Sequence, residues 1–195
     1  MLYLKSMKNT HLQHPEDSIL TGDLTALDWL LSDGDLSVKI DGAPAIVWGT
    51  NPQTGNFFVG TKSVFNKVKI KINETHDDID RNHSGVVADI LHHCFDCLPS
   101  FDGIVQGDFI GYGGDDTFCP NTITYIFDEV IDQNIIIAPH TLYATDGELK
   151  DAYTINDMVD MEIFDDNEYV KFVQPKCWQV DEDFDEVVAF AKQMS

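Results

Sequence analysis

The stretch Ser37–Gly49, "SVKIDGAPAIVWG", places a single lysine in an otherwise apolar run and follows it with an acid and a glycine. Because side chains alternate between the two faces of a strand, a strand through this stretch would place Lys39 and Asp41 on the same face. Gly42 then permits a tight turn, and "PAIVWG" is expected to return as the partner strand. The stretch therefore predicts a hairpin that presents Lys39 and Asp41 together.

Lys39 has two interpretations, a nucleophile in a binding site and a strand lysine whose ammonium group reaches solvent. An ordinary lysine ammonium, with a pKa of about 10.4, is a poor nucleophile until burial or a neighbouring cation frees its lone pair. Lys62, which the hydrophobic pattern assigns to a nearby strand, is a candidate for that neighbouring cation. The residue type and its setting alone leave both interpretations open.

Hydrophobic periodicity and turn-forming residues outline the rest of the fold. Apolar residues at helical spacing predict helices over residues 21–34, 84–98 and 181–194. Runs of β-branched and aromatic residues predict strands over residues 36–41, 44–49, 56–65, 103–112, 121–130, 134–143 and 169–175. The polar segment over residues 73–85 is expected to be a solvated loop.

The order of these elements indicates an α+β fold with mostly antiparallel sheets and flanking helices. At 195 residues the chain can bury one sizeable core, and we expect a single domain over residues 1–195 without an OB-fold domain.

Four cysteines are too few for a disulfide framework in a chain of this length. No apolar run reaches the ~18 residues of a membrane-spanning helix. We therefore expect a cytoplasmic protein with no membrane partner.

The formal net charge of the chain is -22, from 34 acidic and 12 basic residues. Residues 1–71 hold seven acidic and seven basic residues, whereas residues 72–195 hold 27 acidic and five basic ones. Residues 62–71 contain four of the lysines and form a local attractor for phosphate. We therefore expect no extended nucleic-acid footprint outside this segment.

The four residues from Lys39 to Gly42, K-I-D-G, match the motif K-x-D-G, and three further segments follow in order. These are "FFVGTKS" (57–63), "IVQGDFIGY" (104–112) and "TITYIFDEV" (122–130). In the order and rough spacing of these segments, the chain resembles the covalent nucleotidyltransferase superfamily, which comprises DNA ligases, RNA ligases and capping enzymes. Over most of residues 10–140 it also resembles ligase-like proteins of T4-like phages of marine cyanobacteria.

The resemblance implies a ligase-type nucleotidyltransferase domain of ATP-grasp-like architecture, encoded by a phage and active in the host cytoplasm. Lys39 would attack the α-phosphorus of ATP, expel pyrophosphate and carry AMP, while Mg²⁺ would neutralise charge on the leaving group. Asp41 would belong to the catalytic motif, and Asp108 would contact the ribose or the metal. The other implied contacts to nucleotide or polynucleotide are Gly42, Lys62 (phosphate or polynucleotide), Tyr125 or Phe127 (stacking on adenine), Lys171 and Lys176.

The chain also departs from the superfamily pattern. Ala43–Ala45 stand where DNA ligases have an arginine after the motif. The later E-G motif has only Asp146–Gly147 or Glu162 as substitutes. Lys171 and Lys176 have the wrong separation for the final K-x-K motif. Two functions stay open. One is an ATP-dependent ligase-like enzyme, which either stops at self-adenylation or passes AMP to a nucleic-acid end. The alternative is a non-catalytic ligase-fold protein whose acidic surface binds a basic, nucleic-acid-binding partner.

Two other segments invite metal-binding interpretations that their details do not favour. "HHCFDC" (92–97) has histidine and C-x-x-C ligands but no second pair at zinc-finger spacing. A buried helix face that uses Cys94 as a small apolar residue is the better prediction. "DDIDRNHSGVVAD" (77–89) spaces its acids like a calcium loop, but His83 stands where the sixth position needs glycine. We interpret this second segment as a solvated loop.

Overall fold

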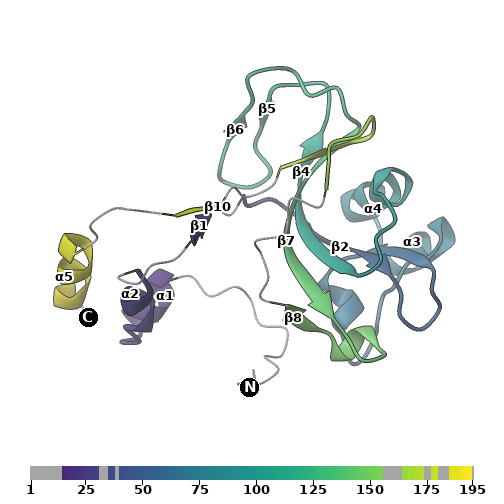
Figure 1. The fold of residues 1–195 in the computed structure, drawn as a ribbon. Helices are drawn as coiled ribbons and strands as arrows, with labels where there is room; N and C mark the ends of the chain where they lie inside the picture. The colour runs from purple at the N-terminus through teal and green to yellow at the C-terminus, as the bar shows by residue number, and fades with distance from the viewer. Residues whose placement is uncertain are drawn as a thin grey trace. The chain divides into compact units, whose positions relative to one another are not determined.

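The structure is a computed structural model of the chain, and it describes residues 15–30, 35–37, 40–155, 164–173, 177–179 and 185–194. These residues fall into two compact units. The larger unit takes the residues described between 40 and 173, and the smaller unit takes those described within 15–37 and 177–194. The larger unit contains the main sheet (Figure 1) and the residues of the candidate site.

Among the described residues, six strands form the main sheet. Five of them follow the order β3-β2-β4-β7-β8, and the sixth, β9, pairs with the first part of β7. All neighbours are antiparallel except β9, which runs parallel to β7. The bounds are β2 Ala45–Thr50, β3 Phe57–Gly60, β4 Ile104–Tyr112, β7 Ile135–Ala144, β8 Tyr153–Ile155 and β9 Val170–Phe172.

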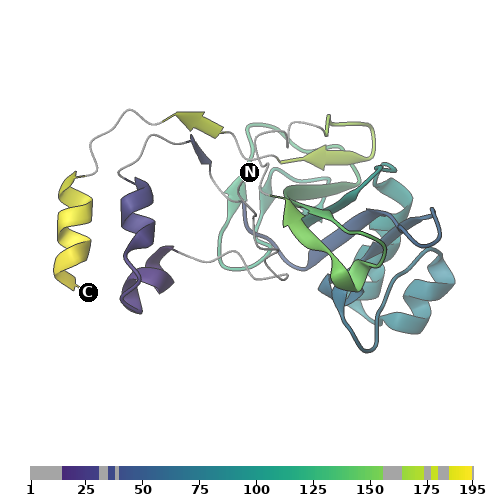
Figure 2. The same cartoon turned by 60° about the horizontal axis from the view of Figure 1, so that its bottom comes forward.

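One face of this sheet packs against α3 (His76–Asn82) and α4 (Val86–Cys97), which lie on the same side in Figures 1 and 2. Val105 and Phe109 of β4 point to this face, and Leu91 of α4 is fully buried against it. The same core includes Ile46, Trp48, Val59, Ile79, Ala88, Ile90, Cys94, Leu98, Ile135, Ile137, Phe164, Val170 and Phe172. Because its side chains are almost all hydrocarbon, this face supplies hydrophobic stabilisation.

The opposite face of β4 carries both apolar and polar residues. Gln106 and Asp108 lie there between Ile104 and Ile110. Both polar side chains are buried, with residue exposures of 3% and 5%. Ile104 belongs to an apolar cluster with Val47, Phe58, Val64, Phe65, Tyr143, Leu149 and Ala152. Ile110 belongs to a second cluster with Phe118, Ile131, Ile136 and Ala138. A buried polar strip therefore separates two apolar clusters on this face.

Short elements border the face that carries the polar strip. The 3₁₀ helices η1 (Lys62–Phe65) and η2 (Leu149–Asp151) contribute side chains to the first cluster. The two-residue strands β5 (Thr117–Phe118) and β6 (Tyr125–Ile126) form an antiparallel pair beside the second cluster. These elements bring chain segments that are distant in sequence to the edges of the polar strip.

The smaller unit combines three helices with a two-stranded antiparallel sheet. Leu27 and Val188 are buried within it. Asp23 begins its second helix by accepting hydrogen bonds from the backbone N–H (3.1 Å) and the hydroxyl (2.7 Å) of Thr25. The bounds are α1 Pro15–Leu20, α2 Thr25–Leu30, β1 Asp35–Ser37, β10 Cys177–Gln179 and α5 Asp185–Met194.

The α+β class with a mostly antiparallel sheet is confirmed. The helix predicted over residues 84–98 is α4, and the strands predicted over 103–112 and 134–143 are β4 and β7. The C-terminal helix is also present, as α5. In the described part of the chain, no helix is both long and apolar enough to cross a membrane. The expectation of a single domain stays a prediction.

The strand predicted over residues 36–41 is confirmed only at residues 36–37, and the part from Ile40 on is wrong. β1 ends at Ser37 and pairs with β10 rather than with β2, and Ile40–Pro44 are not in a strand. Lys39 lies outside the described residues. Asp41 therefore owes its position to contacts made by the segment from 40 to 44, not to strand alternation.

Three further local predictions are wrong. Lys62 begins η1 instead of lying on a strand, because the chain leaves the sheet after Gly60. The segment expected to be a solvated loop contains α3, whose N-terminus is capped by the Thr75 hydroxyl, the acceptor of the Asp78 N–H. Of the strand predicted over residues 121–130, only β6 forms.

Candidate functional site

The segment Ile40–Pro44, hereafter the motif loop, is held against β4. The N–H of Ala43 donates to the carbonyl oxygen of Phe109, and the N–H of Phe109 donates to that of Pro44, both at 3.0 Å. A Cβ atom on residue 42 would lie 2.4 Å from the Phe109 carbonyl oxygen. Only glycine therefore allows the motif loop to approach β4 this closely.

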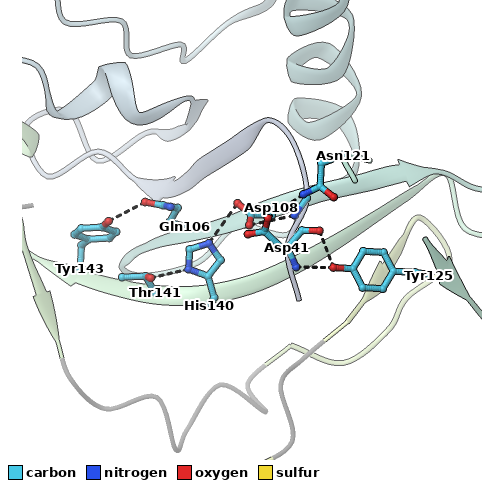
Figure 3. A network of polar contacts seen from close by, with 9 residues as sticks. Asp41, Gln106, Asp108, Asn121, Tyr125, His140, Thr141 and Tyr143 are labelled. Carbon is cyan, nitrogen blue, oxygen red and sulfur yellow. Dashed lines mark hydrogen bonds and ion pairs between the residues drawn. The ribbon is translucent and has the colours of Figure 1, made fainter. Parts of the chain in front are cut away.

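Asp41 is fixed by two side chains from the segment that carries β5 and β6 (Figure 3). The hydroxyl of Tyr125 accepts a hydrogen bond from the Asp41 N–H and donates one to the Asp41 carbonyl oxygen, each at 2.8 Å. The side-chain amide of Asn121 donates to Oδ2 of Asp41, also at 2.8 Å. These contacts hold both the backbone and the carboxylate of Asp41 in one position.

Asp108 connects the motif loop to the buried polar strip. Its Oδ2 accepts a hydrogen bond from the Gly42 N–H at 3.3 Å, and its Oδ1 lies 3.4 Å from Nε2 of His140. The side chains of His140 and Asp108 are 6% and 8% exposed. A carboxylate that is buried this deeply needs such partners, because its removal from water is costly.

A β-bulge in β7 turns His140 toward Asp108. In the register with β4, Gly107 is opposite Pro139 and Gln106 is opposite Thr141, so His140 is the extra residue on β7. Pro139 has no N–H to donate, and the bulge lies between the parts of β7 that pair with β9 and with β8. The proline therefore interrupts no pairing on that second edge.

The bulge also directs Thr141 to the same face as His140. Nδ1 of His140 lies 2.7 Å from the Thr141 hydroxyl, although consecutive residues of a regular strand would point to opposite faces. Farther along, the hydroxyl of Tyr143 donates to Oε1 of Gln106 at 2.8 Å (Figure 3). Burial raises the pKa of Tyr143 to about 12, so this hydroxyl keeps its proton near neutral pH. We call Gln106, Asp108, His140 and Thr141 the polar row.

The polar row offers a carboxylate, an imidazole, an amide and a hydroxyl on one sheet face between two apolar clusters. A few oriented polar groups among apolar side chains are one feature of sites for small polar ligands. A carboxylate and an amide oxygen accept hydrogen bonds from ligand hydroxyl groups such as those of a ribose. The arrangement can therefore orient a ligand, with the motif loop at one end of the row.

The structure brings four of the predicted site residues together and leaves others apart. Asp41, Gly42, Asp108 and Tyr125 form one hydrogen-bonded group. Of the other predicted residues, Phe127 lies beside the second apolar cluster, edge-on to Phe118. Lys62 is exposed on η1, and the ammonium group of Lys171 lies 2.6 Å from the carboxylate of Asp166. Lys39 and Lys176 lie outside the described residues.

The candidate site contains two carboxylates, those of Asp41 and Asp108. Among the described residues, no group of three or more His, Cys, Asp or Glu side chains is arranged to hold a metal ion. Asp108 directs its two oxygens to Gly42 and His140. Mg²⁺ commonly binds through one or two carboxylates together with substrate phosphates and water. The described carboxylates therefore form no protein cage for a metal, and a metal that arrived with a triphosphate would meet an Asp108 whose two oxygens already face Gly42 and His140.

The two other segments with metal-like spacing have structural roles. Cys94 is buried on the core-facing side of α4, as predicted. Its burial raises the pKa of its thiol, and the nearby Cys97 raises it further. His92 of α4 stacks on His76 of α3, with 2.7 Å between their Nδ1 atoms. Asp78 receives the Arg81 guanidinium and the Thr75 hydroxyl within α3. The contact between His76 and His92 joins α3 to α4, and the Asp78 contacts stabilise α3 itself.

The sequence interpretation missed His140, Gln106 and Asn121. The one available signal for His140 was Pro139, because a proline inside an otherwise strand-like run indicates a bulge. Gln106 could be found from its alternation with Asp108 once that residue was assigned to a site face. Asn121 had no signal, since only the folded β5–β6 segment brings it to Asp41.

The chain belongs to a family of unknown function, DUF6267, whose model matches residues 9–195. No curated protein and no solved structure matches the chain.

Proposed function

We propose that this chain is an ATP-dependent nucleotidyltransferase of the polynucleotide-ligase type, which forms a covalent lysyl-AMP intermediate at Lys39. The observation that carries the proposal is the hydrogen bond from the Gly42 N–H to the Asp108 carboxylate. It joins two segments, 66 residues apart in the sequence, that were assigned to one nucleotide site by their resemblance to ligase motifs. The ligase-type fold is part of the same proposal.

The contacts around Asp41 support a preorganised nucleophile. Lys39 precedes Ile40, which packs beside the second apolar cluster, and Asp41, which is held by Tyr125 and Asn121. A nucleophile gains most when the backbone that carries it is fixed before the substrate arrives. The motif loop is fixed in this way on the C-terminal side of Lys39.

The reaction assigns a role to each group. The Nζ atom of Lys39, after loss of its proton to water, attacks the α-phosphorus of ATP; a P–N bond forms, and the bond from that phosphorus to the oxygen that bridges it to the β-phosphorus breaks. Pyrophosphate leaves with the electron pair, and Mg²⁺ would supply positive charge that offsets the negative charge of this leaving group. Asp108 accepts a hydrogen bond from the ribose, and His140 orients that carboxylate.

The aromatic residues of the β5–β6 segment frame the adenine side of the proposed site. Tyr125 uses its hydroxyl on the Asp41 backbone, so only its ring is available to a base. Phe127 meets the edge of Phe118, with ring centroids 5.7 Å apart. In this proposal the base lies against these rings, and the polar row contacts the sugar.

Labelled ATP tests the proposal. The protein incubated with Mg²⁺ and α-³²P-ATP should retain label after denaturing electrophoresis, whereas γ-³²P-ATP should leave none because pyrophosphate departs. Lys39→Ala should abolish the label, and Lys150→Ala, which removes a lysine that is paired with Glu148 outside the proposed site, should retain it. Absence of label from the wild-type protein would refute the enzyme and favour the non-catalytic acidic alternative.

A further inference from the structure

The segment between Asp41 and Glu74 differs in charge from the rest of the chain. It contains no acidic residue and four lysines, within a protein whose net charge is -22. In the structure it comprises β2, β3, η1 and the loop that follows η1. An acid-free segment in so acidic a chain forms a localised positive region.

The loop after η1 is anchored at both ends. At its start, the Thr61 side chain caps η1, and Val64 and Phe65 are buried. At its end, Asn73 exchanges backbone hydrogen bonds with Val59 at 3.0 and 3.2 Å. Lys71 adds a further anchor, because its ammonium group donates to the carbonyl oxygen of Asn82 at 2.5 Å. Between these anchors, the tip of the loop is exposed to solvent.

The tip consists of Asn66–Ile70, five consecutive exposed residues that we call the basic tip. Its lysines, Lys67 and Lys69, alternate with the aliphatic residues Val68 and Ile70, which are 77% and 42% exposed. Lys69 has a φ of 58°, a left-handed conformation that is uncommon for a residue other than glycine. The anchored loop therefore presents ammonium groups and aliphatic side chains together to solvent.

The lysines of this region also differ from the other basic residues in their partners. Arg81, Lys150 and Lys171 each form an ion pair with an acidic residue a few positions away. Within the part of the chain that the structure describes, Lys62, Lys67 and Lys69 form no ion pair or side-chain hydrogen bond. Their charges therefore stay available for a partner outside the molecule.

The basic tip is joined to the face of the sheet that carries the polar row. Phe65, the last residue of η1, packs against Tyr143 in a tilted arrangement, with ring centroids 4.6 Å apart. The Tyr143 hydroxyl in turn donates to Gln106 of the polar row. The segment that carries Lys62 and the basic tip is therefore packed, through Phe65 and Tyr143, against the sheet face with the polar row.

We propose that the basic tip and Lys62 bind the phosphate backbone of a single-stranded polynucleotide, the acceptor of the AMP group. This inference rests on the proposed function, because it supplies that function with its second substrate. Lysines pair with phosphates, and the aliphatic residues between them contact sugars and bases. The acidic remainder of the chain repels a polyanion, so the footprint is confined to about three phosphates. Two exposed aliphatic residues are too small a surface for insertion into a lipid bilayer.

Fluorescence anisotropy with a labelled single-stranded oligonucleotide, as RNA and as DNA, tests the inference across a salt series. Three phosphate contacts predict a slope of log K against log salt of about -2. The variant Lys67→Glu/Lys69→Glu should lose at least about tenfold in affinity at low salt and flatten the slope. The control Lys150→Glu, which changes an ion-paired lysine elsewhere, should bind like the wild type.

Self-adenylation, measured on the same proteins, separates this inference from the proposed function. The tip variant should form lysyl-AMP at the wild-type rate, because the tip touches only the acceptor strand. Oligonucleotide binding that is absent at low salt, or unchanged in the tip variant, would overturn the inference while leaving adenylation standing. Tip-dependent binding to phosphatidylserine vesicles instead of oligonucleotide would also overturn it. Tip-dependent binding without any adenylation would support the surface and refute the enzyme.

Discussion

The two faces of the main sheet differ in what their buried residues do. Toward α3 and α4, β4 contributes Val105 and Phe109 to an apolar core. On the other face, the same strand buries Gln106 and Asp108 between two apolar clusters. Burying polar groups costs free energy that hydrogen bonds at best offset, so stability alone would favour apolar residues there. The helix-covered face therefore accounts for stability, whereas the polar row has the burial cost that we attribute, in the proposed function, to ligand binding.

Leu91→Ala should have the largest effect on stability. Leu91 is fully buried in the helix-covered face, and its truncation should lower the free energy of unfolding by about 3 kcal/mol through lost burial and a cavity. Urea denaturation measures the change. Val86 lies on the same helix but is 71% exposed, so Val86→Ala should change the free energy of unfolding by less than about 0.5 kcal/mol. Equal effects of the two variants would contradict the assignment of stability to this face.

Gly42→Ala should disturb both stability and chemistry. The new Cβ would overlap the Phe109 carbonyl oxygen, so the motif loop must move away from β4, at a cost of about 2 kcal/mol. Lysyl-AMP formation should be lost with it. Gly55→Ala serves as the control: its φ is +76° but no atom lies within 4 Å of the added Cβ, so adenylation should persist. Retained adenylation in Gly42→Ala would show that the close approach is dispensable.

Asp108→Asn should act mainly on chemistry. The amide keeps the size of the carboxylate but removes its charge beside His140 and Gly42. We expect a fall of at least about tenfold in the rate of adenylation, equivalent to ~1.4 kcal/mol in the barrier. The free energy of unfolding should fall less than in Leu91→Ala. The control is Asp102→Asn, at an exposed position just before β4. If Asp108→Asn were adenylated as fast as this control, Asp108 would be excluded from the site.

The smallest expected effect is the pH dependence that His83 gives to the helix-covered face. Burial lowers the pKa of His83 below its ordinary value of 6.5, and the positive charge of Lys71 lowers it further. The unfolded chain therefore takes up this proton at higher pH than the native protein does. The stability that depends on neutral His83 is complete above pH ~6.5 and is lost as the pH falls through the lowered native pKa. Urea midpoints at pH 7.5 and 5.5 should differ less in His83→Asn than in wild type.

The sequence was sufficient where periodicity is strong and insufficient where contacts between distant segments decide. β4, β7 and α4 follow long apolar patterns, and their predictions are confirmed. α3 was missed because Ile79 is its one buried residue, although Thr75 and Asp78 have the spacing of a capping box. The segment at 40–44 could not be predicted, since its conformation depends on β4 and Tyr125.

The candidate site divides in the same way. Asp41, Gly42 and Asp108 were predicted from motif resemblance, and the structure brings them into one hydrogen-bonded group. His140 was missed because the bulge in β7 removes it from the regular alternation on which strand predictions depend. Motifs thus identified the segments of the site, whereas an irregularity of the backbone supplied the partner of its buried carboxylate.

The central claim is that the face with the polar row binds ATP so that Lys39 becomes adenylated. Tandem mass spectrometry of the protein after incubation with ATP and Mg²⁺ tests it most directly, because it locates the modified residue. The account predicts one AMP adduct, on the peptide that contains Lys39, and its loss in Gly42→Ala. An adduct on any other residue, or no adduct in the wild-type protein, would contradict it.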